Sequence, residues 1–162
     1  MPKLTTLRGL GRQQDKIRLL EAALNEVQKE IGKATSQSAE TWHDNAPYEM
    51  LKYDINILNR RLAEAHHLLD DAQIVEYPYI LSQSIVQYGA GVIFTQGEEL
   101  QEYKIVGYGE EDIGKGRILY DCPLAKILIG HRQGESFDIV IHRNKSNVYI
   151  REVYLLTEKD LA

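Results

Sequence analysis

The sequence has a single cysteine, Cys122, so no disulfide can form within the chain. This suits a reducing cytoplasm. Long apolar runs are also missing: no stretch could span a membrane, and the N-terminus lacks the apolar core of a signal peptide. Positive charge is in deficit, with 19 Lys and Arg against 24 Asp and Glu, which disfavours a simple electrostatic binder of nucleic acid. We therefore expect a soluble cytoplasmic protein with no membrane partner.

Patterns typical of catalytic and ligand-binding sites are scarce as well. The residues support neither a Ser/His/Asp order nor a Cys/His pairing. Gly107-Tyr108-Gly109 lacks the third glycine and the following helix of a dinucleotide-binding loop. His66 and His67 are adjacent and point to different sides of a helix, so they do not form an i, i+4 metal site. Glu110-Glu111-Asp112 is interpreted as a solvated acidic turn.

Two long amphipathic runs occupy the first half of the chain. Their apolar residues recur in steps of three and four, which places one narrow seam on each helix. The seam positions are Ile17, Leu20, Leu24, Val27 and Ile31, then Tyr48, Leu51, Ile55, Leu58, Leu62, Ala65, Leu69 and Ala72. We expect an antiparallel helical hairpin, with helices over about residues 12–36 and 47–72 and with Leu24 and Leu58 buried between them.

The start of the first helix and its charged face add two expectations. Gly9 and Gly11 oppose a regular helix before Arg12, although Thr6 could cap a short first turn. The charged residues of the first helix are interpreted as a solvated face with pairs inside the helix. A basic strip along one side of the hairpin is the alternative.

Residues 37–48, here called the tip segment, connect the two predicted helices. A helix of about 25 residues is roughly 40 Å long. The tip segment should therefore lie at the far end of the hairpin, where it presents Glu40, Trp42, His43 and Asp44.

The pattern changes after Gln73. Short strand candidates are Ile85–Tyr88, Gly91–Thr95, Gln101–Gly107, Arg117–Tyr120, Phe137–His142 and Val148–Leu155. Gly97-Glu98 and Asn144-Lys145 resemble hairpin turns. A short helix is predicted at Pro123–Ile129, with Asp121 or Cys122 as its cap and Gly130 after its end. The fold class is α+β: a coiled-coil hairpin over residues 1–76, then a small antiparallel β domain with one short helix over residues 77–162.

Several motifs resemble the GreA/GreB transcript-cleavage factors of bacterial RNA polymerase. The matching stretches are Thr6-Leu7-Arg8-Gly9, Asp44-Asn45-Ala46 with Tyr48, Ala72-Gln73-Ile74-Val75, Tyr103-Lys104-Ile105-Val106-Gly107, Glu111 with Asp112, Cys122-Pro123-Leu124-Ala125, and Leu128-Ile129-Gly130. Together they cover nearly all of the chain. The resemblance implies that the C-terminal domain is FKBP-like and that the protein is a transcription elongation factor.

The resemblance also implies a mechanism. The C-terminal domain would dock at the rim of the polymerase's secondary channel through Asp121, Cys122 and Pro123, and the hairpin would enter the channel. Asp44 and Glu40 would then help the polymerase hold a second Mg²⁺ and cleave the backtracked RNA 3′ end. The protein would be a monomer with no enzymatic activity of its own and no stably bound cofactor.

The tip segment departs from the family pattern D-x-x-E-N-A. Without a gap, Asp44 takes the position of the glutamate, but Thr41 takes that of the aspartate. The stretch up to Asn45 is one residue longer than in the family, so Glu40 is the displaced carboxylate if the extra residue lies in the tip segment. Pro47 also replaces a family glutamate. The alternative is a channel-binding factor that modulates or inhibits transcription without stimulating cleavage; a prolyl isomerase and a coiled-coil chaperone or adaptor are further alternatives.

Overall fold

A computed structural model of the chain describes residues 3–37, 46–77, 84–141 and 144–161. Contacts divide the chain into two compact units: a helical unit of residues 11–72, and a β unit that joins residues 1–10 to residues 73–162. Two long helices precede a β-sheet in chain order, so the predicted α+β class is confirmed.

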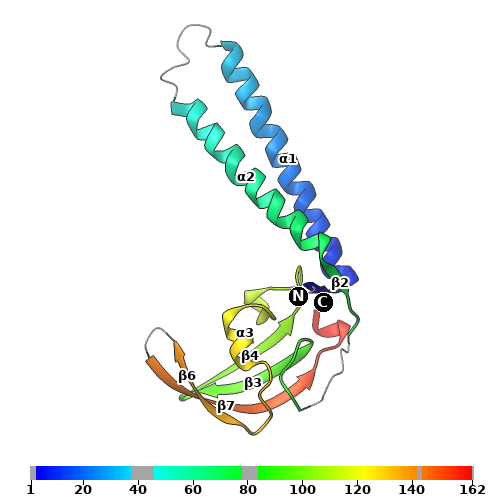
Figure 1. Ribbon diagram of the computed structural model, residues 1–162, viewed down its shortest axis with the longest axis vertical. Helices are drawn as coiled ribbons and strands as arrows, with labels where there is room; N and C mark the ends of the chain where they lie inside the picture. Colours follow the sequence, from blue (N-terminus) through cyan, green and yellow to red (C-terminus); the bar gives the residue numbers. More distant parts are fainter. Residues whose placement is uncertain (1–2, 38–45, 78–83, 142–143, 162) are drawn as a thin grey trace. The chain divides into compact units, whose positions relative to one another are not determined.

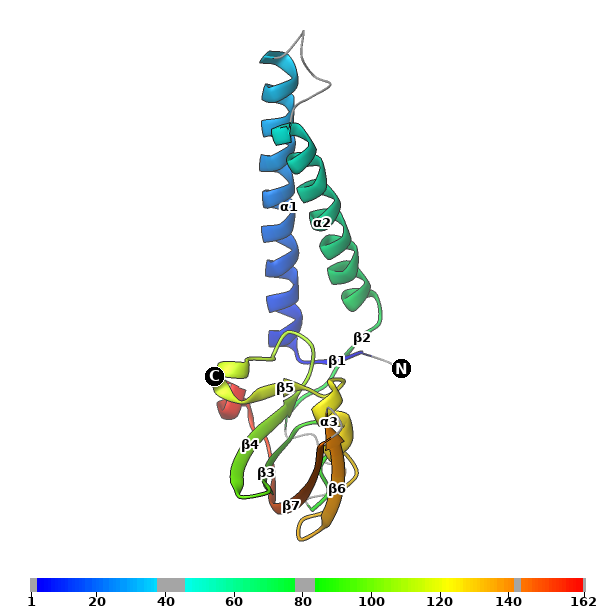
Figure 2. The same ribbon diagram turned by 90° about the vertical axis from the view of Figure 1, so that its left-hand side faces the viewer.

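The helical unit consists of α1 (Leu7–Gln37), apart from its first turn, and α2 (Ala46–Asp70), which lie side by side (Figure 1, Figure 2). Between Ile17 and Ile31, the predicted seam positions are buried or half-buried, and every other residue of that interval is exposed. In α2 the predicted seam positions from Tyr48 to Leu69 are likewise buried or half-buried. The seam predicted from the heptad spacing is therefore confirmed. The prediction that this helix reaches Ala72 is wrong, because α2 ends at Asp70 and Ala72 begins the short strand β2 (Ala72–Ile74).

The depth of burial in this seam is smaller than predicted. Leu24 and Leu58 are half-buried rather than buried. Full burial is reached at the seam positions Ile17, with 6% exposure, and Ala65, with 1%. Two helices cover each other along one line, and solvent reaches that line from both sides, so most seam side chains keep an exposed edge.

The charged residues of the helices form local pairs. Arg18 pairs with Asp15 at 3.1 Å, and Lys29 pairs with Glu26 at 2.7 Å, each within one helical turn and largely exposed. Exposed pairs of this kind contribute little to stability, because solvent screens the charges. They support the interpretation of a solvated face.

No helix in the described part of the chain has both the length and the apolar character needed to cross a membrane.

The predicted helix start at Arg12 is wrong, because α1 begins at Leu7 and runs through Gly9 and Gly11. The Thr6 hydroxyl accepts a hydrogen bond from the Gly9 amide at 3.1 Å, as an N-cap does. A Cβ on Gly9 would lie 2.6 Å from the Tyr108 carbonyl oxygen. Glycine is needed there for close backbone contact, which outweighs its low helix propensity.

Residues 1–10, which the sequence pattern groups with the hairpin, make backbone contacts within the β unit. The Tyr108 amide donates to the Leu4 carbonyl at 3.0 Å, and the Val75 amide donates to the Thr5 carbonyl at 2.9 Å. A two-stranded sheet pairs β1 (Lys3–Thr5) with β2 (Ala72–Ile74). These hydrogen bonds explain why the first residues cluster with the β unit.

The main sheet of the β unit has five strands in the order β5-β4-β3-β7-β6. Their bounds are β3 (Ala90–Gln96), β4 (Glu99–Val106), β5 (Arg117–Leu119), β6 (Ser136–Ile141) and β7 (Asn144–Leu155). All neighbours pair antiparallel except β5, which runs parallel to β4. The prediction of a wholly antiparallel sheet is wrong at β5, because the loop of residues 107–116, with η2 (Ile113–Lys115), carries the chain back before β5 begins.

The core of the β unit lies between this sheet and the short helix α3 (Pro123–Leu128) (Figure 2). Its buried members are Val86, Ala90, Val92, Phe94, Ile105, Ala125, Leu128, Ile139, Val148, Ile150 and Val153. In β7, the buried Val148 and Ile150 alternate with exposed residues, which places both side chains on the face of the sheet that belongs to this core.

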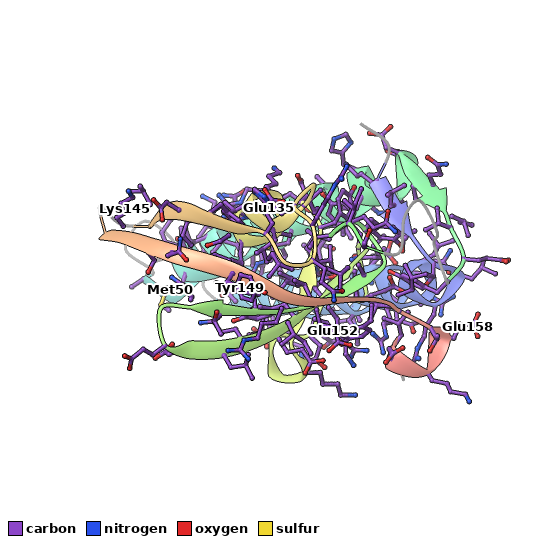
Figure 3. All side chains as sticks on the ribbon, turned by 90° about the horizontal axis from the view of Figure 1, so that it is seen from below. Met50, Glu135, Lys145, Tyr149, Glu152 and Glu158 are labelled. Atoms are coloured by element: carbon purple, nitrogen blue, oxygen red, sulfur yellow. The ribbon has the colours of Figure 1, made fainter. Side chains whose placement is uncertain are left out.

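Two details of the predicted strands change. Ile85–Tyr88 is not a strand, since Ile85 makes an isolated bridge with Arg132 and the segment pairs no further. Gly97, with φ of 62°, starts the predicted turn between β3 and β4, which is confirmed. The predicted turn at Asn144-Lys145 is wrong, because both residues pair with β6. Lys145 lies near the start of β7, and Tyr149 and Glu152 follow along the strand (Figure 3).

Candidate functional site

The two predicted metal-binding residues, Glu40 and Asp44, lie outside the described residues. The same holds for Thr41. The flanking helices are described up to Gln37, the last residue of α1, and from Ala46, the first residue of α2. The roles of both carboxylates therefore remain predictions for the segment that connects the helices.

The predicted docking segment, Asp121-Cys122-Pro123, forms the start of α3. Cys122 is the N-cap: its backbone is extended, and its Sγ accepts a hydrogen bond from the Ala125 amide at 3.4 Å. Pro123 occupies the first turn, where its missing N–H leaves no bond unmade. Of the two predicted caps, the structure selects Cys122, which leaves the Asp121 carboxylate available for other contacts.

Asp121 directs its carboxylate at two neighbouring side chains. Its Oδ1 lies 2.6 Å from Lys126 Nζ, and its Oδ2 accepts a hydrogen bond from the Tyr108 hydroxyl at 3.2 Å. These hydrogen bonds, that of Lys126 first, hold the pKa of Asp121 below its usual range. The Asp121 side chain is 47% exposed. The site thus offers an ionised, oriented carboxylate at the surface.

Tyr108 is a member of this site that sequence reasoning missed. Its ring packs edge-to-face on Tyr120, with ring centres 5.7 Å apart and planes at 88°, and Tyr120 packs in the same way on Tyr88. Burial first, and then the hydrogen bond to Asp121, raises the pKa of Tyr108 to about 12. At neutral pH the hydroxyl therefore stays protonated and donates a hydrogen bond to Asp121. No local spacing rule relates two residues that lie on separate loops.

The interpretation of residues 110–112 as a solvated acidic turn is wrong for Glu110, whose side chain is 1% exposed. Its carboxylate accepts hydrogen bonds from the Thr6 hydroxyl, the Tyr77 hydroxyl at 3.3 Å and the Gly107 amide at 3.2 Å. A buried polar side chain is tolerated when hydrogen bonds satisfy it. Burial, followed by nearby Tyr88 and Glu110, strongly raises the pKa of Tyr77, which stays a donor. Glu110 therefore connects Thr6 to the loop after β4 through hydrogen bonds.

Arg117, the first residue of β5, is also buried, at 2% exposure. Its Nη1 donates to the Leu161 carbonyl at 2.6 Å, and its Nη2 donates to Asp112 Oδ2 at 3.2 Å. Leu161 ends the C-terminal turn η3 (Glu158–Leu161). Arg117 and Glu110 thus stabilise the loop that carries Tyr108, and their burial points to a structural role.

Metal binding finds no support within the described ranges, where no three His, Cys, Asp or Glu side chains are grouped so that they could hold an ion. His131 instead stacks on Phe137, with ring centres 3.6 Å apart, and its Nδ1 lies 2.8 Å from Glu135 Oε1. His142 lies outside the described residues.

A hollow of about 230 Å³ lies on the β unit. Its lining consists of Thr6, Leu7, Arg8, Glu158 and Leu161. None of these residues is aromatic. This hollow therefore does not provide the aromatic-lined pocket that the prolyl isomerase alternative requires.

Comparison with known proteins places these observations in context. A family model described as "Transcription elongation factor, GreA/GreB, C-term" matches residues 81–155. The chain is 34% identical over 92 residues to transcription elongation factor GreA of Thermomicrobium roseum, a match that covers 57% of this chain and 59% of that protein. It is 30% identical over 148 residues to transcription elongation factor GreA of a Nitratiruptor species, which covers 90% of this chain and 89% of that protein.

A solved structure also aligns with the chain. The crystal structure of GreA factor homolog 1 of Thermus thermophilus is 19% identical, and the alignment covers 95% of this chain and 99% of that chain with a TM-score of 0.45. A score this low supports no argument about fold or activity. The match to the Nitratiruptor protein, which spans most of both chains, is the stronger finding.

Proposed function

This chain belongs to the GreA/GreB family of transcription elongation factors, and from that premise we propose that it binds bacterial RNA polymerase through the secondary channel. In this proposal the β unit docks at the rim of the channel, and the hairpin of α1 and α2 enters it. The protein then stimulates the polymerase's own cleavage of backtracked RNA. Its residues bind and orient, and the polymerase performs the chemistry.

The observation that carries this proposal is the hairpin itself. Helices of 31 and 25 residues face each other along one apolar seam, and a single segment with two carboxylates connects them. At 1.5 Å per residue, α1 is about 46 Å long and α2 about 37 Å. A hairpin of this length supports a role in which Glu40 and Asp44 act far from the docking surface.

Glu40 and Asp44 would hold the second Mg²⁺ together with ligands from the polymerase. Their donor set fits this role, because Mg²⁺ prefers hard oxygen ligands and is commonly held by one or two carboxylates together with phosphate oxygens. When bound, the ion would supply the positive charge that favours attack on the RNA phosphate. Two carboxylates are too few for a dedicated site, so the free protein should bind Mg²⁺ weakly or not at all.

Transcript cleavage in a stalled, backtracked complex tests the proposal. Asp44→Asn should abolish stimulated cleavage without loosening binding to the polymerase, and Glu40→Gln should do the same. Thr41→Ala is the matched control within the tip segment and should cleave like the wild type. If Glu40→Gln alone is silent, Asp44 acts without the partner assigned to it here.

A second candidate function follows from the sequence of the tip segment. Thr41 stands where the family has an aspartate, and Pro47 replaces a family glutamate. A threonine cannot supply the second negative charge. These departures favour a factor that occupies the channel and modulates or inhibits transcription. Tight binding to the polymerase without any acceleration of cleavage, even with abundant Mg²⁺, would select this function.

A further inference from the structure

We infer that Tyr108 is a positioning residue of the docking surface: it orients the Asp121 carboxylate to accept a cationic side chain of the docking partner. The inference rests on the proposed function, because it takes Asp121 as a contact to RNA polymerase. It goes further by naming the group that orients Asp121 and the chemistry that Asp121 meets.

The backbone of Tyr108 is held by its two glycine neighbours. A Cβ on Gly107 would lie 2.5 Å from the Leu4 carbonyl oxygen, and a Cβ on Gly109 would lie 2.3 Å from the Gly9 carbonyl oxygen. The Tyr108 amide also donates to the Leu4 carbonyl at 3.0 Å. With neighbouring backbone this close on both sides, the Cα of Tyr108 has a fixed place in the β unit.

The ring of Tyr108 is held as well. It packs edge-to-face on Tyr120, which the Leu4 amide contacts through a hydrogen bond to its hydroxyl at 3.3 Å. Tyr120 packs in turn on the buried Tyr88. A tyrosine has two side-chain torsions, and this packing restrains both, so the position of its hydroxyl is set by the fold.

Lys126 cannot orient Asp121 in the same way. The Lys126 side chain is 62% exposed, and its long stem holds one point charge. Exposed ion pairs of this kind contribute little and exchange with solvent. The hydrogen bond from the Tyr108 hydroxyl thus orients the Asp121 carboxylate. The Lys126 ammonium only neutralises its charge, and a cationic side chain of the partner can displace it.

The chemistry of Asp121 identifies the complementary group. An ionised carboxylate accepts hydrogen bonds at about four lone-pair sites and donates none. Two protein donors use two of these sites. The remaining sites face a half-exposed surface, where a lysine or arginine of the partner can bind and replace Lys126.

Equilibrium binding of the full-length chain to RNA polymerase core enzyme tests the inference. Tyr108→Phe keeps the ring and removes the hydroxyl. Its affinity should be about 2- to 12-fold weaker, since the partner must then order the carboxylate itself. Tyr154→Phe is the matched control, because the Tyr154 hydroxyl donates to the Glu102 carboxylate at 2.5 Å elsewhere on the β unit. This control should bind like the wild type.

A double-mutant cycle separates positioning from a structural role. In an Asp121→Ala background, Tyr108→Phe should cause no further loss of affinity, because Tyr108 acts through Asp121. An equal loss in both backgrounds, which a folding defect would also produce, overturns the inference. If Asp121→Ala weakens binding but Tyr108→Phe does not, the inference fails and the docking role stands. If Asp121→Ala binds like the wild type, the docking role itself fails.

Discussion

Truncation of Glu110 to alanine should strongly destabilise the β unit. The substitution removes the acceptor shared by Thr6, Tyr77 and the Gly107 amide. Thr6 is half-buried and can turn toward water, but the Tyr77 and Gly107 donors are buried. A buried donor without a partner costs about 1–3 kcal/mol, so two of them cost about 2–6 kcal/mol. This is a large part of the roughly 5–15 kcal/mol that stabilises a typical domain.

Urea denaturation measures this loss through the near-ultraviolet circular dichroism of the tyrosines, most of which lie in the β unit. Glu98→Ala is the matched control, because Glu98 is exposed in the turn between β3 and β4. The control should stay within about 0.5 kcal/mol of the wild type. If Glu110→Ala unfolds at the same urea concentration as Glu98→Ala, Glu110 is not the buried anchor described above.

Three further perturbations address other parts of the fold. Gly97→Ala should cost about 1–2 kcal/mol for its positive φ, and Gly109→Ala should cost more, because its Cβ would also meet the Gly9 carbonyl; equal melting temperatures would contradict this. Leu24→Ala or Leu58→Ala should each cost about 1–2 kcal/mol, below the value for a buried leucine, and unchanged helix melting in both would refute the hairpin seam. Because the folded pKa of Tyr108 is raised from 10.0 to about 12, its contribution to stability is present below pH 10 and is lost as pH rises to 12. An alkaline absorbance titration should show one phenol with a midpoint near 12 in the wild type and none in Tyr108→Phe.

The helical hairpin could be predicted because its signal is local. Apolar residues recur in steps of three and four along both runs. Between Ile17 and Ile31, the positions chosen by this spacing are the ones that are buried or half-buried. Helix α3 was equally readable, since its proline and the glycine after its end mark both limits. The start of α1 was missed because Gly9 serves a contact with Tyr108, more than ninety residues away in the chain, and no propensity records such a contact.

The candidate site was only partly predictable for the same reason. Cys122 and Pro123 carry a helix-start signal, and Asp121 stands beside them. The burial of Glu110 depends on Thr6 and Tyr77, both distant in sequence, so three adjacent acidic residues read as a solvated turn. The glycines on either side of Tyr108 do not form a dinucleotide-binding motif in the sequence, and only the folded structure shows that they hold Tyr108 in place through close backbone contacts.

The most direct test of the central claim is the rate of RNA cleavage in a stalled, backtracked polymerase complex, measured at equal occupancy by the wild type and by Asp44→Asn. Matching the occupancy separates the contribution of the tip segment from docking. We predict that the wild type accelerates cleavage and that Asp44→Asn, although bound, leaves the rate at the level of polymerase alone. Equal rates for the wild type, Asp44→Asn and polymerase alone, with both proteins bound, would contradict the account and assign the protein to the channel-occupying alternative.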